Sequence, residues 1–293
     1  MKNKLSLFAV PYVGWMSIFV VAPIIIMVVY AFSTAAGDFT LENFARMGTY
    51  TAVFTRSFKL AIIATLIALL IGYPVSYMLS KEGPQVQRIA MVLIMLPMWM
   101  NFLLRTYSWM SILENNGLLN QLFQQIGLID LYNQIAMHFA SDPAAYVPID
   151  HFQMIGTQGA VVLGMVYNYL PFMILPIYSV IVKLDHSLIE AARDLGANSV
   201  QVFRRVILPL SLPGVLSGIT MVFVPSVSTF DISRLLGGGT QMMLGDLIEQ
   251  QFLGGAYNPQ LGAAIALVMM AIVVVCMLVM NRFGDGEEQA VML

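Results

Sequence analysis

Six stretches of mostly apolar residues run through this chain, and they limit the folds that are open to it. Each is close to the ~20 residues that an α-helix needs to cross a bilayer. The stretches are 5–32, 58–79, 89–113, 158–182, 212–232 and 261–280. Charged residues make up only 10% of the chain, whereas soluble domains hold about 25%. The sequence therefore predicts an all-α integral membrane protein with six transmembrane helices.

The basic residues between these stretches predict the orientation, because Lys and Arg concentrate in cytoplasmic loops. With both termini in the cytoplasm, the inner segments hold nine of them: Lys2, Lys4, Lys81, Arg88, Lys183, Arg193, Arg204, Arg205 and Arg282. The outer segments then hold four: Arg46, Arg56, Lys59 and Arg234. The longest loop, 114–157, contains neither Lys nor Arg and falls outside. An amphipathic pattern at 117–126 predicts a short helix in it, and we expect the rest of the loop to be irregular.

Several functional classes receive no support from the composition. The net charge of −2 does not indicate nucleic-acid binding, and the single cysteine, Cys276, excludes an internal disulfide or a thiol-rich metal site. His138 and His151 are separated within the outer loop and His186 lies on the inner side of the membrane, so we expect no metal site shared by the three histidines. No Ser/His/Asp or paired-carboxylate arrangement on one side indicates catalysis.

The polar stretch 187–213 lies between the fourth and fifth predicted spans, on the cytoplasmic side. Ser187 and Glu190 have the spacing of a capping box, which predicts that a short helix begins at Ser187. Gly196 is placed to end this helix, since glycine readily adopts the left-handed conformation found there.

A second short helix should follow. Asn198 or Ser199 can cap its start, and Pro209 should end it. Both helices are too short to be stable alone in water. They therefore need support from the membrane surface, from neighbouring segments or from a partner protein.

The same stretch carries a spaced motif: Glu190-Ala191-Ala192, then Gly196, then Val206-x-Leu208-Pro209. This resembles the EAA loop of the permease subunits of ABC-type importers. The family pattern is EAA, three residues, Gly, nine residues, Ile, one residue and Leu-Pro. The chain keeps this spacing throughout and departs from it only in having Val206 for Ile. The predicted topology also places the loop where the family has it.

Further motifs extend the resemblance over nearly the whole chain: Gly72-Tyr73-Pro74, Pro97-x-Trp99-x-Asn101-x-x-x-Arg105-x-Tyr107, Asn115-x-Gly117-x-Leu119-Asn120, Leu170-Pro171-Phe172-Met173 and Leu235-x-Gly237-Gly238. They are similar to the permeases of spermidine/putrescine importers, and among these to the first permease subunit, the PotB type. The resemblance implies a subunit that forms, with a second permease, the pathway for polyamines.

The resemblance also implies a fold and partners. The fold is that of a type I ABC importer permease (MetI-like), with a core of five membrane helices plus an N-terminal helix. The partners are a second homologous permease subunit, two copies of a cytoplasmic ATPase subunit and an extracellular substrate-binding protein, at a bacterial cytoplasmic membrane. We divide the chain into an N-terminal helix with its outer loop (1–57), the permease domain (58–282, with a coupling loop at 183–211) and a short acidic cytoplasmic tail (283–293).

ATP hydrolysis is expected on a partner. The chain has no phosphate-binding G-x-x-x-x-G-K-[ST] sequence. We therefore expect this subunit to be no enzyme, with no catalytic residue, cofactor or metal of its own, and ATP and Mg to bind the partner ATPase.

The resemblance assigns ATPase coupling to eight residues: Glu190, Ala191, Ala192, Arg193, Asp194, Gly196, Leu208 and Pro209. Small side chains at Ala191 and Ala192 allow a helix to seat closely in a groove, while Glu190 and Arg193 can contact its rim. The alternative from the sequence alone is an interfacial amphipathic helix that binds no partner.

Substrate-path candidates lie in the outer half of the bundle: Trp99, Tyr107, Tyr167, Tyr169, Ser226, Ser228, Thr229 and Asp231. Pro225 is expected to break the fifth span there, and broken polar helices often line transport sites. Asp231 could hold an ammonium group, and aromatic rings could add cation–π contacts. The alternatives are that Asp231 is solvated or pairs with Arg234, and that the rings form an interfacial belt. Arg105 is expected to pair with a carboxylate or with carbonyls, because it would repel a cationic substrate.

Three other hypotheses remain open. One is a permease of the same architecture for another small solute. A second is an ATP-independent secondary transporter, which would need buried acid pairs and internal repeats. A third is a membrane enzyme, which would need a nucleophile and base, or paired aspartates, within the spans. The last two leave the EAA motif unexplained.

Overall fold

The computed structural model describes residues 11–139 and 146–291, with the backbone alone described for 281 and 283–291. These residues are helical throughout except for loops and one isolated antiparallel bridge between Ser33 and Phe39. In chain order the elements are η1 (Ser17–Val21), α2 (Ala22–Ala31), α3 (Glu42–Arg46), η2 (Met47–Tyr50), α4 (Thr51–Ser80), α5 (Pro84–Met95), η3 (Leu96–Trp99), α6 (Phe102–Leu113), α7 (Leu118–Gln125), α8 (Leu128–Phe139), α9 (Gln158–Ile181), α10 (His186–Asp194), α11 (Ser199–Val202), η4 (Phe203–Ile207), α12 (Leu208–Ser228), α13 (Asp231–Leu236), α14 (Leu244–Leu253) and α15 (Pro259–Val291).

Among the described residues, the candidate membrane spans match the predicted fold class. Five helices are long and apolar enough to cross a bilayer, and the count rises to six if a bent pair is counted as one span. The five are Pro11–Ala31, Glu42–Ser80, Gln158–Ile181, Ser199–Ser228 and Pro259–Met280. The predicted all-helical membrane fold is confirmed. Residues 5–10 of the first predicted span lie outside the described residues.

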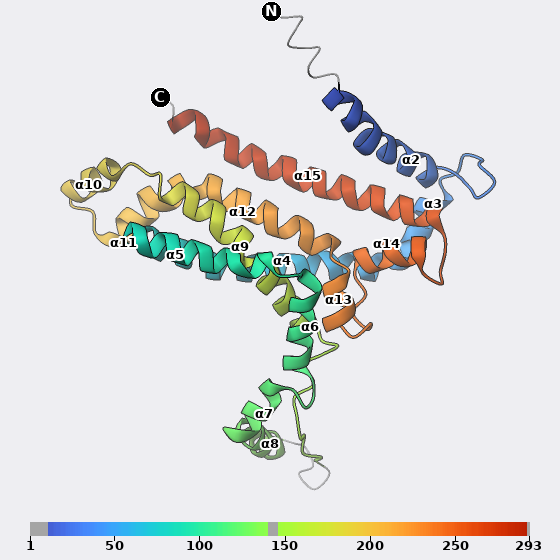
Figure 1. The fold of residues 1–293 in the computed structure, drawn as a ribbon, viewed down its shortest axis with the longest axis horizontal. Helices are drawn as coiled ribbons and strands as arrows, with labels where there is room; N and C mark the ends of the chain where they lie inside the picture. Colours follow the sequence, from blue (N-terminus) through green and yellow to red (C-terminus); the bar gives the residue numbers. More distant parts are fainter. Residues whose placement is uncertain (1–10, 140–145, 292–293) are drawn as a thin grey trace, which may run out of the picture.

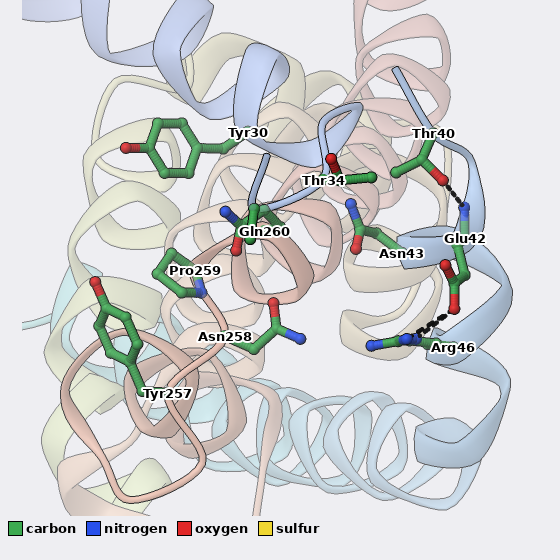
Figure 2. Close-up of a pocket in the computed structure, with 11 residues that line it drawn as sticks. Tyr30, Thr34, Thr40, Glu42, Asn43, Arg46, Tyr257, Asn258, Pro259 and Gln260 are labelled. Carbon is green, nitrogen blue, oxygen red and sulfur yellow. Dashed lines mark hydrogen bonds and ion pairs between the residues drawn. The ribbon is translucent and has the colours of Figure 1, made fainter. Parts of the chain in front are cut away.

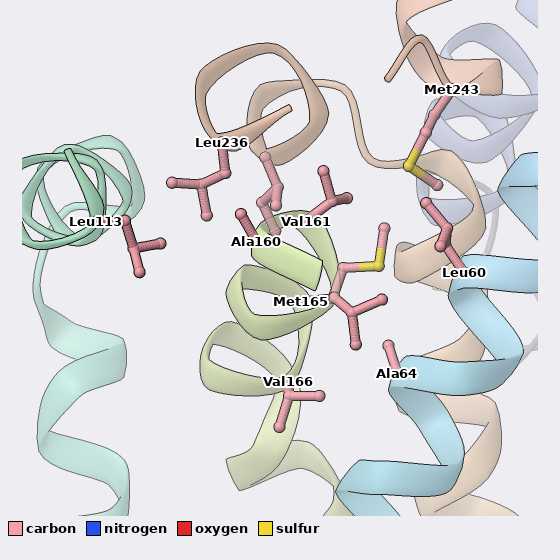
Figure 3. Close-up of a cluster of buried hydrophobic side chains, with 11 residues drawn as sticks. Leu60, Ala64, Leu113, Ala160, Val161, Met165, Val166, Leu236 and Met243 are labelled. Carbon is pink, nitrogen blue, oxygen red and sulfur yellow. The ribbon is translucent and has the colours of Figure 1, made fainter. Parts of the chain in front are cut away.

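The core of the bundle is formed by α4, α9 and α12, which pack on one another. Glycines allow their close approach. A Cβ at Gly218 of α12 would lie 2.8 Å from the Met173 sulfur of α9, and one at Gly72 of α4 would lie 2.9 Å from Met173 Cγ. Apolar side chains from α4 and α9 then interlock with α13, as Figure 3 shows for Leu60, Met165 and Leu236.

The N-terminal helix stands apart from this core. It packs chiefly on α15, and the apolar window of Pro11–Ala31 is not buried in the chain. Figure 1 shows α2 and α15 along one side of the bundle. This agrees with an N-terminal helix added to a five-helix core. The bundle has an end that carries α10, which we call the α10 end, and an opposite far end with α3 and α14 (Figure 1).

The third predicted span, 89–113, is a pair of helices with a sharp bend between them, which counts as a sixth span only if the two halves are taken together. The two halves, Pro84–Trp99 and Phe102–Gln125, meet at an angle of 91°. Met100 is extended there, and the Asn101 side chain caps α6 by accepting the Leu103 N–H at 2.8 Å. Side-chain capping favours a new helix start over continuation. The second half leads into an arm, α6 to α8, which points away from the bundle in Figure 1.

The long loop is also more regular than predicted. The short helix expected at 117–126 is present as α7, but residues 128–139, expected to be irregular, form α8. Asn133 anchors α8 to the returning chain: its Nδ2 donates to the Ile149 carbonyl at 2.9 Å, and its Oδ1 accepts the Ile149 N–H at 3.0 Å. Residues 146–149 form no helix or strand, as expected, while Asp142-Pro143 lies outside the described residues.

Candidate functional site

The first candidate site is the loop at the α10 end. The N-cap of α10 is Asp185, whose carboxylate accepts the Ser187 N–H at 2.9 Å. This hydrogen bond is the main reason that the pKa of Asp185 is lowered. The predicted start at Ser187 was therefore wrong by two positions, because the Asp185 carboxylate, two residues earlier, accepts the hydrogen bond from the unpaired Ser187 N–H.

Gly196 ends α10 as predicted. Its φ is +82°, in the left-handed region that glycine tolerates. The Gly196 N–H donates to the Arg193 carbonyl at 2.8 Å and the Ala197 N–H to the Ala192 carbonyl at 3.0 Å. These two bonds form a Schellman motif, which satisfies carbonyls at the end of the helix. The loop therefore has a defined shape.

The predicted coupling residues of α10 lie on the surface. Glu190, Ala191, Arg193 and Asp194 are exposed and Ala192 is half-buried, while the helix buries no residue at all. Apolar side chains are exposed alongside them: Leu188 at 47%, Leu195 at 89% and Val200 at 64%. Val200 was not singled out from the sequence. An apolar group this exposed at the tip of a projecting loop is typical of a docking surface.

The second helix of the loop begins as predicted but does not end where expected. Asn198 and Gln201 form a reciprocal capping box, with both hydrogen bonds at 2.9 Å. The helix then runs through the π-helical turn η4 into α12, so Pro209, predicted to stop it, lies in its interior. Proline lacks the N–H that would donate a helical hydrogen bond. The wider π turn lies directly before it, and there the Leu208 N–H donates to the Phe203 carbonyl, five residues earlier. Leu208 and Pro209 thus join the loop to a membrane helix.

The second candidate site is near the far end, where α6, α9 and α13 meet. Arg105 of α6 is buried, and its Cζ lies 5.9 Å from the ring centroids of both Phe102 and Tyr167. Its Nε and Nη1 have no acceptor among the described residues, so the expected carboxylate or carbonyl partner is not found there. Trp109 packs edge-on against Tyr167, with ring centroids 5.3 Å apart.

Tyr169, Thr229 and Asp231 come together beside this group. The side chains of Thr229, Asp231 and Arg105 all lie near the Tyr169 hydroxyl. Three of the predicted path residues, from two distant parts of the chain, are therefore neighbours. Tyr167 lies beside Arg105 instead, while Trp99 (75% exposed) and Tyr107 (46% exposed) lie on the outside of the chain.

The end of α12 differs from the prediction. Pro225 lies inside α12, and the helix is interrupted only later, at Thr229 and Phe230, between α12 and α13. The hydroxyls of Ser226 and Ser228 donate back to the carbonyls of Val222 and Val224, at 2.7 and 3.2 Å. Both hydroxyl groups therefore bond within their own helix.

The break is fixed by α14. A Cβ at Gly245 would lie 2.4 Å from the Ser228 carbonyl oxygen and 2.6 Å from that of Thr229, so only glycine fits. Asp246, which is buried, accepts the Ser233 hydroxyl at 2.5 Å and the Met243 N–H at 2.9 Å. Burial raises the pKa of Asp246, although these hydrogen bonds oppose that effect. The sequence analysis missed Gly245 and Asp246, which hold α13 in place.

Asp231 is half-buried and begins α13 rather than ending α12. Partial burial raises its pKa; Arg234 opposes this effect and Glu249 adds to it. Arg234 makes its ion pair with Glu249, not with Asp231. Asp231 therefore presents a carboxylate that forms no ion pair within the described residues.

A separate polar hollow of about 530 Å³ opens at the far end (Figure 2). It lies between the end of α2, the helix α3 and the turn before α15, and includes the Glu42–Arg46 ion pair at 2.7 Å. Asn43 fixes its wall by donating to the carbonyls of Ala31 and Ser33, each at 3.0 Å. None of the predicted path residues lines it.

A model of the family described as "Binding-protein-dependent transport system inner membrane component" matches residues 64–286. The chain belongs to this family. It is 36% identical over 285 residues to the spermidine/putrescine transport system permease protein PotB of Haemophilus influenzae, with 93% of each chain covered. It is 35% identical over 281 residues to the Escherichia coli protein of the same name, with 93% and 95% covered. The predicted membership of the ABC importer permeases, and the resemblance to the PotB type, are confirmed.

Solved structures of bacterial ABC transporters share the fold. A chain of a bacterial ABC transporter involved in the import of alginate superimposes with a TM-score of 0.76 at 17% identity, covering 97% of this chain and 96% of that one. A chain of the MetNI methionine ABC transporter in an inward-facing conformation gives 0.54 at 18% identity, covering 84% and 98%. The chain is thus a multi-pass inner-membrane transport component with the type I importer permease fold.

Proposed function

We propose that this chain is a translocating subunit of an ATP-driven importer for polyamines such as spermidine and putrescine. The observation that carries the proposal is the projecting helix α10, whose EAA motif and apolar tip are left uncovered by the residues that the structure describes. The polyamine substrate is supported by the relatives at 35–36% identity that are named as spermidine/putrescine permeases.

The remaining parts of the importer are proposed as partners. A second homologous permease completes the pathway, two copies of a cytoplasmic ATPase bind the coupling loops, and an extracellular binding protein delivers the substrate. This subunit is then not an enzyme, because ATP and Mg bind the partner ATPase. Its α10 end and both termini face the cytoplasm, as the distribution of Lys and Arg indicates.

Coupling follows from the shape of α10. Ala191 and Ala192 leave little side chain between the helix backbone and a groove on the ATPase. Leu195 offers an apolar group that would lose its exposure on docking. Glu190 and Arg193 are exposed beside them and can form polar contacts at the rim. The Schellman motif at Gly196 holds this surface in one shape before it binds, which lowers the entropy cost of docking.

The path for an ammonium group runs past Tyr169, Thr229 and Asp231. A carboxylate without an ion-pair partner attracts a cation, and an aromatic ring adds about 0.5–2 kcal/mol through cation–π attraction. Contacts of this size suit a path that must bind weakly and release. The nearby Arg105 guanidinium repels the same cation, which favours its approach to Asp231.

Coupling is tested in liposomes containing the two permeases, the ATPase and the binding protein. Glu190→Ala should reduce ATP hydrolysis stimulated by the loaded binding protein, while insertion of the permease stays unchanged. Unchanged stimulation would remove α10 from the coupling site.

The path is tested by uptake of labelled polyamine. Asp231→Asn should slow uptake while assembly is preserved. Asp130→Asn is the matched control, because Asp130 is an exposed acid on the α6–α8 arm. Equal uptake by both variants and the parent would show that Asp231 has a structural role only.

A further inference from the structure

Movement of α10 can reach the membrane helices by few routes. The helix is exposed along its length, and its principal contacts are with α11 and with the π-helical turn η4. The π-helical turn continues directly into α12, the membrane helix that follows it. A displacement of α10 by a docked ATPase can therefore reach the bundle along two routes, residues 182–185, which join α10 to α9, and residues 199–207, which α10 also contacts.

Within that segment, Phe203 reaches a different membrane helix. It is the first residue of η4 and is half-buried. Its ring centroid lies 5.8 Å from that of Tyr73 at 86°, and 5.1 Å from that of Tyr77 at 64°. Tyr73 and Tyr77 are one turn apart on α4, so the Phe203 ring contacts two successive turns of that helix edge to face. Edge-to-face packing fixes the orientation of all three rings.

The contact on α4 extends to the other core helices. The Tyr73 hydroxyl and the Ser211 hydroxyl of α12 form a buried hydrogen bond of 2.8 Å. One turn along α4 from Tyr73, the buried Ser76 hydroxyl donates to the Ile174 carbonyl of α9 at 3.0 Å. The three core helices are thus tied together next to Phe203, at the level where the loop joins the bundle.

The local backbone also sets this position apart. η4 is a π-helical turn, and such turns are rare insertions of one residue that often occur at functional sites. Close-packed interiors transmit displacement and switch between discrete arrangements rather than deforming smoothly. A ring held between two tyrosines is suited to pass on such a movement.

We propose that Phe203 is the positioning residue that transmits movement of the coupling loop to α4, and through Tyr73 and Ser76 to α12 and α9. It acts through its neighbours and contacts neither ATP nor substrate. This inference rests on the coupling role proposed for α10, and it adds a specific route from α10 into the bundle.

The test uses the complete transporter in nanodiscs, with ATP hydrolysis measured with and without the loaded binding protein. Phe203→Ala should lower the stimulated rate by roughly tenfold, a typical coupling effect, while the basal rate and co-purification of the ATPase stay near the parent values. Phe203→Tyr keeps the ring and should retain stimulation. Phe172→Ala is the matched control, because Phe172 is a half-buried phenylalanine of α9 packed on the same apolar cluster away from the loop.

The outcomes separate this inference from the proposed function. If Phe203→Ala keeps full stimulation while Glu190→Ala loses it, the route through Phe203 is wrong and α10 still couples. If Phe203→Ala and Phe172→Ala lose stimulation equally, or if Phe203→Ala no longer retains the ATPase, Phe203 serves the fold and the inference fails. If Glu190→Ala is also without effect, the proposed coupling role itself fails.

Discussion

Replacing Gly196 tests the shape of the coupling loop. A Cβ at this position would have no atom within 4 Å, so Gly196→Ala causes no clash. The cost arises from the backbone alone, because φ is +82° and a side chain makes this conformation less favourable by about 1–2 kcal/mol. Relief of that strain breaks the two hydrogen bonds that Gly196 and Ala197 donate to the end of α10.

The expected magnitude follows from that cost. If the loop must regain its shape to dock, the strain is subtracted from the binding free energy. A loss of about 1–2 kcal/mol corresponds to a roughly 5- to 30-fold weaker affinity for the ATPase. The thermal stability of the permease should change little, since α10 buries no residue.

The assay is a titration of the purified ATPase against the permease pair in nanodiscs. Gly83→Ala is the matched control: this site also has no atom within 4 Å of a new Cβ, but its φ is −67°, which alanine adopts readily. Gly83→Ala should leave the affinity unchanged. An affinity for Gly196→Ala within twofold of the parent would refute the argument that loop shape controls docking.

Three further predictions concern the far end. Gly245→Ala should displace α14 by roughly 1 Å from the Ser228 and Thr229 carbonyls and lower the free energy of unfolding by about 1–3 kcal/mol. We expect a lower melting temperature and slower uptake, and an unchanged melting temperature would contradict this prediction. Because the pKa of Asp231 is raised, uptake should fall on mild acidification as Asp231 is protonated, and Asp231→Asn should flatten that dependence. The pKa of Asp246 is raised by burial, so the folded chain holds this proton more tightly and the free energy of unfolding should fall as pH rises from the ordinary to the raised pKa. Asp246→Asn should abolish that fall in melting experiments, and an identical pH profile would refute it.

The parts of the fold that the sequence predicts correctly depend on local chemistry. Apolar runs of the right length must cross the bilayer or be buried, whatever surrounds them. The end of α10 at Gly196 is also local, because only the backbone conformation matters there. The cap at Asn198 follows from its own side chain in the same way.

The wrong predictions occur where two local sequence signals compete, or where contacts with distant segments determine the local structure. Ser187 fits a capping box, but the helix is capped two residues earlier, because the Asp185 carboxylate accepts the Ser187 N–H. Pro209 and Pro225 both indicate helix ends, yet a π-helical turn and continuous packing carry α12 past them. The helix at 128–139 is stabilised by a hydrogen bond from Asn133 to Ile149, 16 residues later in an irregular segment, and no local sequence pattern predicts this contact.

The candidate path shows the same division. The sequence indicates which residue types could hold an ammonium group, but not which of them meet. Tyr169 and Thr229 are 60 positions apart but lie near each other, at the end of α12 that Gly245 of α14 also approaches closely. The burial of Arg105 between two rings is likewise a tertiary property.

The most direct test of the proposed function is ATP-dependent uptake of labelled spermidine and putrescine by liposomes that contain this chain, its second permease, the ATPase and the binding protein. We predict accumulation of polyamine that requires both ATP and the binding protein and is abolished when α10 is impaired by Glu190→Ala. The absence of polyamine uptake, in a complex whose ATP hydrolysis is stimulated by a binding protein loaded with a different solute, would contradict the proposed function.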